Sequence, residues 1–185
     1  MRELSLHILD IAQNSIVAQA DEIRIAIVED YRDDQLAICI KDDGVGMDQD
    51  TVRKVVDPFY TTRTTRKVGL GIPMFKQAAE LCDGSFSITS SPGVGTDIVA
   101  KFKLSHIDRM PLGNMSDTLI TIINSNANVD LLYTHQIDDE KFTLCTRDIK
   151  KTLGELPITN LDVLIWLREY IKENLEEMHR KVGRL

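Results

Sequence analysis

The sequence has few of the features that mark disulfide-rich, zinc-binding or membrane proteins. Its 185 residues include only three cysteines, Cys39, Cys82 and Cys145, which are far apart and form no CxxC pair. We therefore expect neither a disulfide framework nor a zinc site, and a reducing cytoplasm is the simplest compartment. No apolar run approaches the roughly 18 residues needed to span a bilayer. Asp10 interrupts the first apolar stretch, so a secretory signal is not expected.

The sequence also has fewer basic than acidic residues. The chain has 22 basic and 29 acidic residues and a net charge of −7, so a charge-driven nucleic-acid binder is not expected. Hydrophobic residues make up 43% of the chain, which is enough for a packed core. We expect one domain over residues 1–106 and a smaller α/β extension of unknown role over residues 107–185.

Residues 1–106 alternate between helical and strand patterns of apolar residues. The predicted elements are a helix over about 3–19, strands around 23–27 and 36–40, a helix capped by Asp48, a helix over about 72–82 that ends at Gly84, and the strands SFSITS and TDIVAKFKL. The strands join in pairs without long crossovers, so mixed or antiparallel pairing is expected.

Residues 107–185 have a different pattern and contain no motif that indicates a function. The predicted elements are a helix from Ser116, the strands VDLLYTHQI and KFTLCTR, a short helix RDIKKTLG, and a long helix capped at Thr159 or Asn160. Trp166 and Tyr170 lie on the long helix, where we expect core or dimer contacts.

Asp10 and Asn14 form the first of four motifs in residues 1–106. They are four residues apart in a predicted helix, so both side chains project from the same face. A carboxylate and an amide placed in this way can hold a hydrated Mg²⁺ ion, which prefers hard oxygen ligands. An ordinary amphipathic helix with two polar surface residues would explain the same pair.

The second motif, DDGVGM, directly follows a predicted strand. The carboxylate of Asp42 stands at the end of that strand and can accept a hydrogen bond from an exocyclic amine. Gly44 and Gly46 allow backbone to approach a flat ligand closely. A plain turn is the alternative, since Asp-Gly pairs are common in turns.

The third motif is a stretch with several hydroxyl groups that carries basic residues and no acidic residue over 58–71. Its basic residues and glycines are Arg63, Arg66, Lys67, Gly69 and Gly71. A helix N-terminus with glycines and nearby cations can bind an anion, although a flexible surface loop is the alternative. The fourth motif, GVGT, is a turn that places the hydroxyl of Thr96 at the start of a strand. An ordinary hairpin turn without a function is the alternative.

Together, in this order and at these intervals, the four motifs resemble those of the histidine-kinase-like ATPase superfamily, which also contains gyrase-type and MutL-type ATPases. The resemblance covers about residues 1–104. Asp10 and Asn14 fall on the N box, and the run QNSIVAQADEIRIAI looks like its gyrase and mismatch-repair version. Asp42, Gly44 and Gly46 fall on the DxGxG box.

The other matching segments look like those of sensor kinases. DPFYTT falls on the F box, KVGLGI on the second glycine box, and SSPGVGTDIVAKF resembles the final hairpin of the kinase domain. The fold implied is an α/β (α+β) two-layer sandwich, with a mixed four- to five-stranded sheet covered on one face by three helices. The C-terminal extension would be a small α/β appendage to it.

The resemblance implies that ATP and Mg²⁺ bind between the helices and a lid formed by residues 58–70. By the resemblance, Asn14 ligates Mg²⁺, and Asp10 acts as general base and contacts the metal through water. Asp42 recognises adenine, and Thr96 supports Asp42 through water. The phosphates are contacted by Arg63, Arg66 and Lys67, and the lid approaches them closely at Gly69 and Gly71.

Position 10 departs from the gyrase and MutL branch, which has a glutamate there. Aspartate is one methylene shorter, so its reach to an attacking water is reduced, and slow or absent hydrolysis both fit the sequence. Ser105–Pro111 partly resembles a phospho-acceptor motif around His106, but the acidic residue expected after the histidine is missing. A strand end that leads into a linker is the favoured interpretation of that segment.

The leading expectation is a cytoplasmic, free-standing ATP- and Mg²⁺-binding regulatory protein, an ATPase or kinase that acts on an unidentified partner protein. One alternative is a conformational ATPase that forms a homodimer on binding ATP. Another is a nucleotide sensor or assembly module that does not hydrolyse ATP. Neither nucleic acid nor a membrane is expected as a partner.

Overall fold

The computed structural model describes residues 3–57 and 71–183 of the chain. In order, its elements are α1 (Leu4–Val17), β1 (Glu22–Asp30), β2 (Gln35–Asp42), α2 (Gln49–Val55), α3 (Gly71–Glu80), β3 (Ser85–Ser91), β4 (Gly95–Lys103), α4 (Met115–Ser125), β5 (Asp130–Ile137), β6 (Glu140–Cys145), α5 (Thr146–Leu153) and α6 (Leu161–Lys181).

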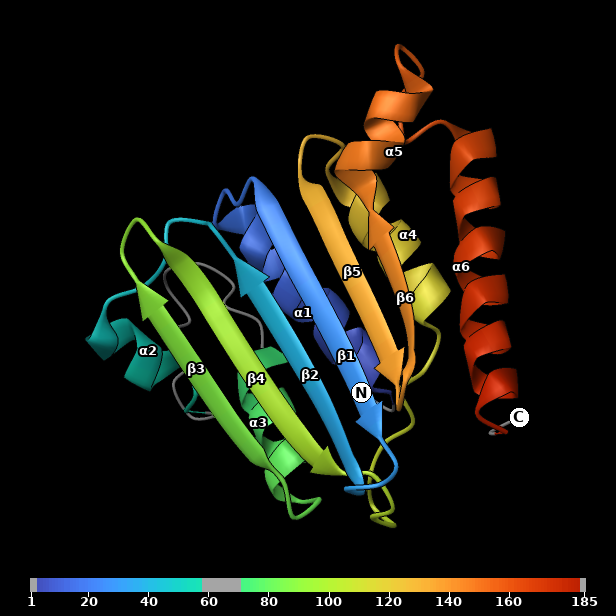
Figure 1. The fold of residues 1–185 in the computed structure, drawn as a ribbon. Helices are drawn as coiled ribbons and strands as arrows, with labels where there is room; N and C mark the ends of the chain where they lie inside the picture. Colours follow the sequence, from blue (N-terminus) through green and yellow to red (C-terminus); the bar gives the residue numbers. More distant parts are fainter. Residues whose placement is uncertain (1–2, 58–70, 184–185) are drawn as a thin grey trace.

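One mixed sheet runs through the described part of the chain, in the strand order β3-β4-β2-β1-β5-β6. Its pairs are antiparallel except for β1 with β5, which are parallel and joined by a long connection that contains α4. Figure 1 shows β5 beside β1 and β6 beside β5, although both strands come from the C-terminal segment. The prediction of a mixed sheet in an α+β sandwich is confirmed.

The number of strands differs from the predicted four or five, because β5 and β6 of residues 107–185 extend the sheet to six. Glu22–Glu29 of β1 pair with Asp130–Ile137 of β5. This pairing satisfies backbone groups that would otherwise form an open edge at β1. Local sequence patterns report the period of a strand and not its partner, so this pairing could not be predicted from them.

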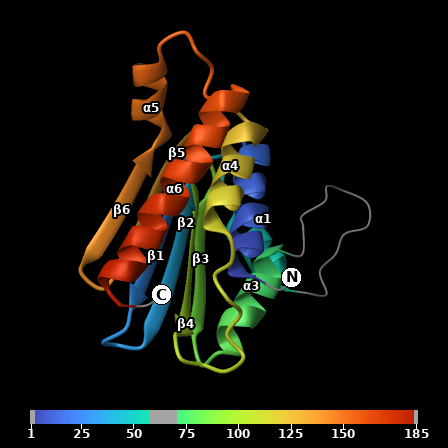
Figure 2. The same ribbon diagram turned by 90° about the vertical axis from the view of Figure 1, so that its right-hand side faces the viewer.

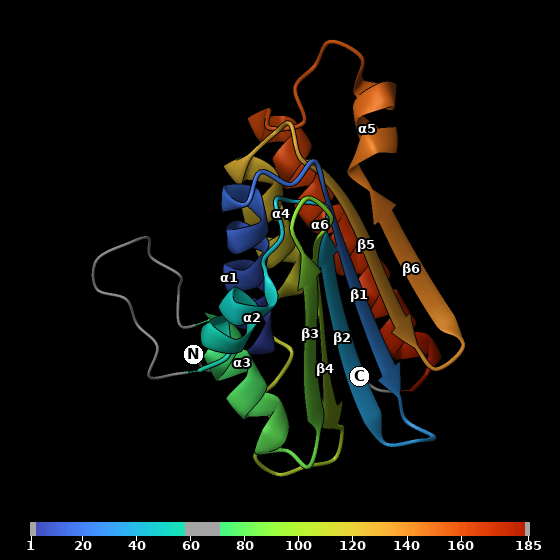
Figure 3. The same cartoon turned by 90° about the vertical axis from the view of Figure 1, so that its left-hand side faces the viewer.

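Helices α1, α3, α4 and α6 lie on one face of the sheet (Figures 2 and 3). The strands explain this arrangement, because residues on alternate positions of β1, such as Ile23, Ile25 and Ile27, are buried while Arg24 points to solvent. The buried residues of the strands and of these helices form one hydrophobic core that includes residues from both segments of the chain.

The ends of several helices match the capping residues expected from the sequence. The Asp48 side chain accepts a hydrogen bond from the Thr51 backbone N–H at 2.7 Å, and Asn160 accepts one from Asp162 at 2.9 Å. Helix α4 begins at Met115, one residue before the predicted start, because Asn114 is its cap. No helix in the described residues is long and apolar enough to cross a membrane.

Candidate functional site

Asp42 is the last residue of β2, and both of its carboxylate oxygens are held by neighbours. Its Oδ2 accepts a hydrogen bond from the Ser15 hydroxyl at 2.6 Å. Its Oδ1 accepts hydrogen bonds from the backbone N–H groups of Gly44 at 3.0 Å and Thr96 at 3.2 Å. These donors belong to α1, the loop after β2, and β4, so the carboxylate has a fixed orientation at the junction of three segments.

The hydrogen bonds leave part of the acceptor capacity of Asp42 unused. An ionised carboxylate has about four lone-pair sites, and the three donors named above occupy three of them. Oδ2 accepts from Ser15 alone among the described residues, so it can take one further hydrogen bond from an amine or a water. Asp42 is 9% exposed, so it is buried but not completely enclosed.

Thr96 supports Asp42 in a way that the sequence did not reveal. Antiparallel pairing of β2 and β4 places Thr96 opposite Asp42, so its backbone N–H reaches the carboxylate directly. The Thr96 hydroxyl lies 3.0 Å from the hydroxyl of Ser90. Ser90 also accepts a hydrogen bond from Met47 N–H and donates one to the Gly95 carbonyl, both at 2.8 Å.

Ser90 therefore ties the loop after β2 to the β3–β4 hairpin, and sequence reasoning did not single it out. Its only signal in the sequence is a place two residues before a Pro-Gly turn. Gly46 is required by the same packing, because it has a φ of 66° and a Cβ there would lie 1.9 Å from the Ser91 carbonyl oxygen. Close packing against the hairpin thus accounts for this glycine without a ligand.

Asp10 and Asn14 lie on α1, four residues apart as predicted. The Nδ2 atom of Asn14 is buried and has no hydrogen-bond partner among the described residues. A buried amide without partners is costly, and such groups are common where a ligand, ion or water completes the site. The Nδ2 group can donate a hydrogen bond to a water or an anion, while the amide oxygen of Asn14 and the carboxylate of Asp10 are the kinds of oxygen ligand that a hydrated Mg²⁺ ion accepts.

Gly71, the first residue of α3, packs closely against Asp10. A Cβ at position 71 would lie 2.9 Å from the Asp10 Cβ, so this contact requires a glycine. The structure thereby brings Gly71, the last glycine of the second glycine motif, to the N box. Four other residues with predicted roles lie outside the described residues, and their roles stay predictions. They are Arg63, Arg66, Lys67 and Gly69.

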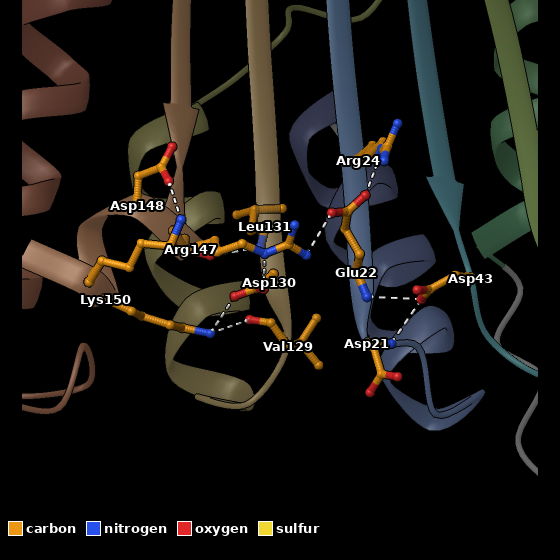
Figure 4. A network of polar contacts seen from close by, with 12 residues as sticks. Asp21, Glu22, Arg24, Asp43, Val129, Asp130, Leu131, Arg147, Asp148 and Lys150 are labelled. Carbon is orange, nitrogen blue, oxygen red and sulfur yellow. Dashed lines mark hydrogen bonds and ion pairs between the residues drawn. The ribbon is translucent and has the colours of Figure 1, made fainter.

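A polar network connects the DxGxG segment to the C-terminal extension (Figure 4). Asp43 Oδ1 accepts the backbone N–H groups of Asp21 and Glu22, both at 2.8 Å. The Glu22 carboxylate in turn pairs with Arg147 at 3.0 Å, and Arg147 pairs with Asp130 at 2.7 Å. The residue next to Asp42 is therefore linked to α5 through a backbone hydrogen bond and the ion pair between Glu22 and Arg147.

Asp130 is the centre of this network in the extension. Lys150 lies 2.9 Å from its other carboxylate oxygen. Partial burial alone would raise the pKa of Asp130, but the hydrogen bonds from Lys150 and Arg147 outweigh it and lower the pKa. The Asp130 hydrogen bond and charge raise the pKa of Arg147. Both partners are therefore charged near neutral pH.

The segment around His106 forms turns and contains no helix. Strand β4 ends at Lys103, and the next helix begins at Met115. The His106 Nδ1 atom accepts a hydrogen bond from Asp108 N–H at 3.2 Å. This is the strand end and linker favoured from the sequence.

The fold and these residues define a nucleotide-binding ATPase domain of the α+β class. A sequence model described as "Histidine kinase-, DNA gyrase B-, and HSP90-like ATPase" matches residues 2–106, which is more than half of the chain. The chain belongs to this family. The resemblance drawn from the four motifs is thereby confirmed.

Curated relatives include several sensor kinases. The chain is 35% identical over 95 residues to "Signal transduction histidine-protein kinase AtoS" of Escherichia coli, covering 51% of this chain and 15% of that protein. It is 30% identical over 109 residues to a "Putative sensor protein" of Shewanella frigidimarina, covering 58% of this chain and 17% of that protein. The chain thus spans about a sixth of the length of these relatives.

Solved structures show the same fold at low sequence identity. The "Aquifex aeolicus MutL ATPase domain complexed with ADP" aligns with a TM-score of 0.52 and 11% identity, over 83% of this chain and 69% of that one. The "N terminal domain of a DNA repair protein" aligns with a TM-score of 0.55 and 14% identity, over 84% and 58%. These shares exceed what residues 1–106 can supply, so the likeness in fold extends into the C-terminal segment.

Proposed function

We propose that this protein binds ATP with Mg²⁺ and acts as a regulatory ATPase or kinase on a partner protein. The observation that carries the proposal is the Asp42 carboxylate, which is held by Ser15, Gly44 and Thr96 with one acceptor position unused. A carboxylate fixed in this way can select the exocyclic amine of adenine, because an acceptor rejects a base that presents a carbonyl in its place.

The same proposal assigns roles along the bound nucleotide. Asn14 would ligate Mg²⁺ through its amide oxygen, and Asp10 would orient a water on the metal or act as a general base. Mg²⁺ would supply positive charge to the phosphates. Arg63, Arg66 and Lys67 would contact the phosphates, and Gly69 and Gly71 would let backbone approach them. A protein partner is part of the proposal and is supported by the sensor and signal-transduction relatives, and a cytoplasmic location is a further part of it.

Calorimetric titration with Mg²⁺–ATP tests the adenine contact. Asp42→Asn should weaken ATP affinity by about 10-fold or more, since a hydrogen bond to a charged group contributes about 1.5–3 kcal/mol and the amide can present a donor to the adenine amine. Asp33→Asn is the matched control, because Asp33 is exposed in the β1–β2 turn. Undiminished affinity in Asp42→Asn would refute the placement of adenine.

A second candidate is a conformational ATPase that dimerises when ATP binds. The likeness in fold to the MutL ATPase domain favours it, since that likeness includes part of the C-terminal segment. Light scattering with and without a non-hydrolysable ATP analogue distinguishes the two candidates. A dimer that appears only with the analogue supports this second function, whereas an unchanged mass favours action on a separate partner.

A further inference from the structure

A cavity separate from the Asp42 site lies between α6, the segment from Arg109 to Ser116, and the ends of β1 and β5. Its volume is about 340 Å³, which is enough for a small molecule. Glu29 of β1 and His135 of β5 line it, and they are 8% and 1% exposed. Nothing in the proposed ATP site uses these residues.

A chain of hydrogen bonds fixes the buried polar groups of this cavity. His135 Nε2 donates to Glu29 Oε1 at 2.8 Å, because a carboxylate can only accept. The other ring nitrogen, Nδ1, then accepts from the Tyr133 hydroxyl at 2.8 Å in the neutral imidazole. Tyr31 donates to the second oxygen of Glu29 at 3.1 Å.

This chain leaves Glu29 as a preorganised anion. Burial alone would raise the pKa of Glu29, but the hydrogen bonds from His135 and Tyr31 help to outweigh it, and the pKa is lowered. Burial and the charge of Glu29 keep the Tyr133 hydroxyl protonated by raising its pKa. Among residues 3–57 and 71–183, each oxygen of Glu29 has one hydrogen-bond donor and so can accept a further hydrogen bond from a ligand.

Helix α6 lines the cavity with charged groups on one face. Lys172, Glu176 and His179 follow at helical spacing, and in the described part of the chain none of them has a hydrogen bond or ion pair. On the opposite rim, Arg109 is held by the carbonyl groups of Leu104 at 2.7 Å and Met110 at 3.1 Å.

The sign of these charges restricts the ligand. The lining has two carboxylates, Glu29 and Glu176, and two permanent cations, Arg109 and Lys172. A ligand with only negative charge would be repelled by the two carboxylates, and a ligand with only positive charge would be repelled by the two basic groups. An uncharged apolar molecule would leave buried Glu29 with an unused acceptor, which is unfavourable.

We propose that this cavity binds a small zwitterion of the α-amino-acid class, with its ammonium group between Glu29 and Glu176 and its carboxylate at Lys172 and Arg109. The apolar side chains of Leu112, Met115 and Leu175 line the rest of the cavity and leave room for a small apolar side chain of the ligand. This site would lie between the C-terminal segment and β1, and it shares no residue with the proposed ATP site.

Thermal unfolding of the full chain against the standard α-amino acids tests the proposal. At least one should raise the midpoint by about 5–10 °C at a concentration of about 100 times its dissociation constant. Its N-acetyl derivative, which lacks the ammonium group, and its amide, which lacks the carboxylate, should give no comparable rise. If no amino acid raises the midpoint, or if either derivative does so equally, the proposal is overturned.

Two substitutions on α6 locate the site, because both side chains are exposed and the variants should fold. Lys172→Met and Glu176→Gln should each weaken binding of the active amino acid by about 10-fold. Glu169→Gln, on an exposed part of the same helix, and Asp42→Asn, in the proposed ATP site, should leave it unchanged. The proposal is overturned if Glu169→Gln weakens binding as much as the first two variants do. It is also overturned if Lys172→Met or Glu176→Gln leaves the affinity unchanged, because the ligand then binds elsewhere.

Discussion

The hydroxyl of Ser15 donates a 2.6 Å hydrogen bond to Oδ2 of Asp42, across 27 residues of sequence. Ser15 is 2% exposed and follows Asn14 directly on α1, so the same turn of helix faces both the proposed adenine contact and the proposed metal. The relationship makes the N box and the DxGxG box one structural unit. A change at Ser15 should therefore affect both stability and nucleotide affinity.

Ser15→Ala removes this hydrogen bond while α1 keeps a good helix former. We expect the free energy of unfolding to fall by about 1–3 kcal/mol, because Asp42 loses its only donor on Oδ2 among the described residues. Urea unfolding measures this loss, and Ser125→Ala, at an exposed helix end, is the control. A variant as stable as the original protein would show that the bond contributes nothing net.

Asp10→Asn tests base catalysis at the N box. The amide keeps the size of the side chain and its contact with Gly71, but it cannot accept a proton. If Asp10 is the general base, steady-state ATP turnover should fall by about 100-fold or more, with ATP affinity little changed. Turnover equal to that of the original protein excludes this role for Asp10.

Acid should weaken the contact between β1 and β5 through Glu29. Its pKa in the folded protein lies below the ordinary value of 4.5, so Glu29 contributes stability above pH 4.5. That contribution is lost as pH falls through the lower folded pKa, because the unfolded chain then binds more protons. Urea unfolding between neutral pH and about pH 3 should show this loss.

Glu29→Gln is the variant that isolates the effect. It should unfold about 1–3 kcal/mol more easily at neutral pH, because buried His135 and Tyr31 lose a charged acceptor. It should also show a shallower decline of stability in acid. An identical pH profile in Glu29→Gln would mean that other carboxylates account for the acid dependence.

Arg147→Ala should loosen the extension from the DxGxG segment at low salt. The Arg147 side chain is 53% exposed, so its pairs with Glu22 and Asp130 are partly screened and the effect on the urea midpoint should be small. At about 1 M salt, where the Debye length falls to about 3 Å, the difference should shrink further. Lys151→Ala, whose pair with Asp148 lies within α5, is the control.

If Arg147→Ala lowers stability equally at both salt concentrations, the loss comes from packing of the Arg147 alkyl stem and not from its charge.

The same variant also tests a functional role of the network. If the network transmits changes to Asp43, ATP affinity should change in Arg147→Ala and stay constant in Lys151→Ala. Equal affinities in all three proteins would confine the network to a structural role.

Local patterns predicted most elements because their causes are local. The apolar spacing of Leu4, Ile8 and Ile11 predicted α1, and the alternation of Ile23, Ile25 and Ile27 predicted β1. Asp48 was identified as a cap because its side chain needs only the N–H three residues later. Motif order within residues 1–106 was also enough to indicate the family.

Local sequence patterns did not predict the contacts between residues that are far apart in the chain. None of the four sequence motifs contains His135, whereas the structure gives it hydrogen bonds to Tyr133 and Glu29. The partner Glu29 is 106 residues away, and no spacing rule connects the two. Likewise, Thr96 was expected to act through water, but strand register brings its backbone N–H directly to Asp42.

The sequence by itself indicated the kind of protein, because its four motifs resemble, in order and interval, those of the histidine-kinase-like ATPase superfamily. Only the tertiary structure decided how the 79 residues after position 106 are used. Parallel pairing of β5 with β1 makes them part of the same sheet and core, and places Glu29, His135 and α6 around one cavity. Pairing of strands so far apart depends on which edges and apolar faces remain to be covered, and the whole fold sets that condition.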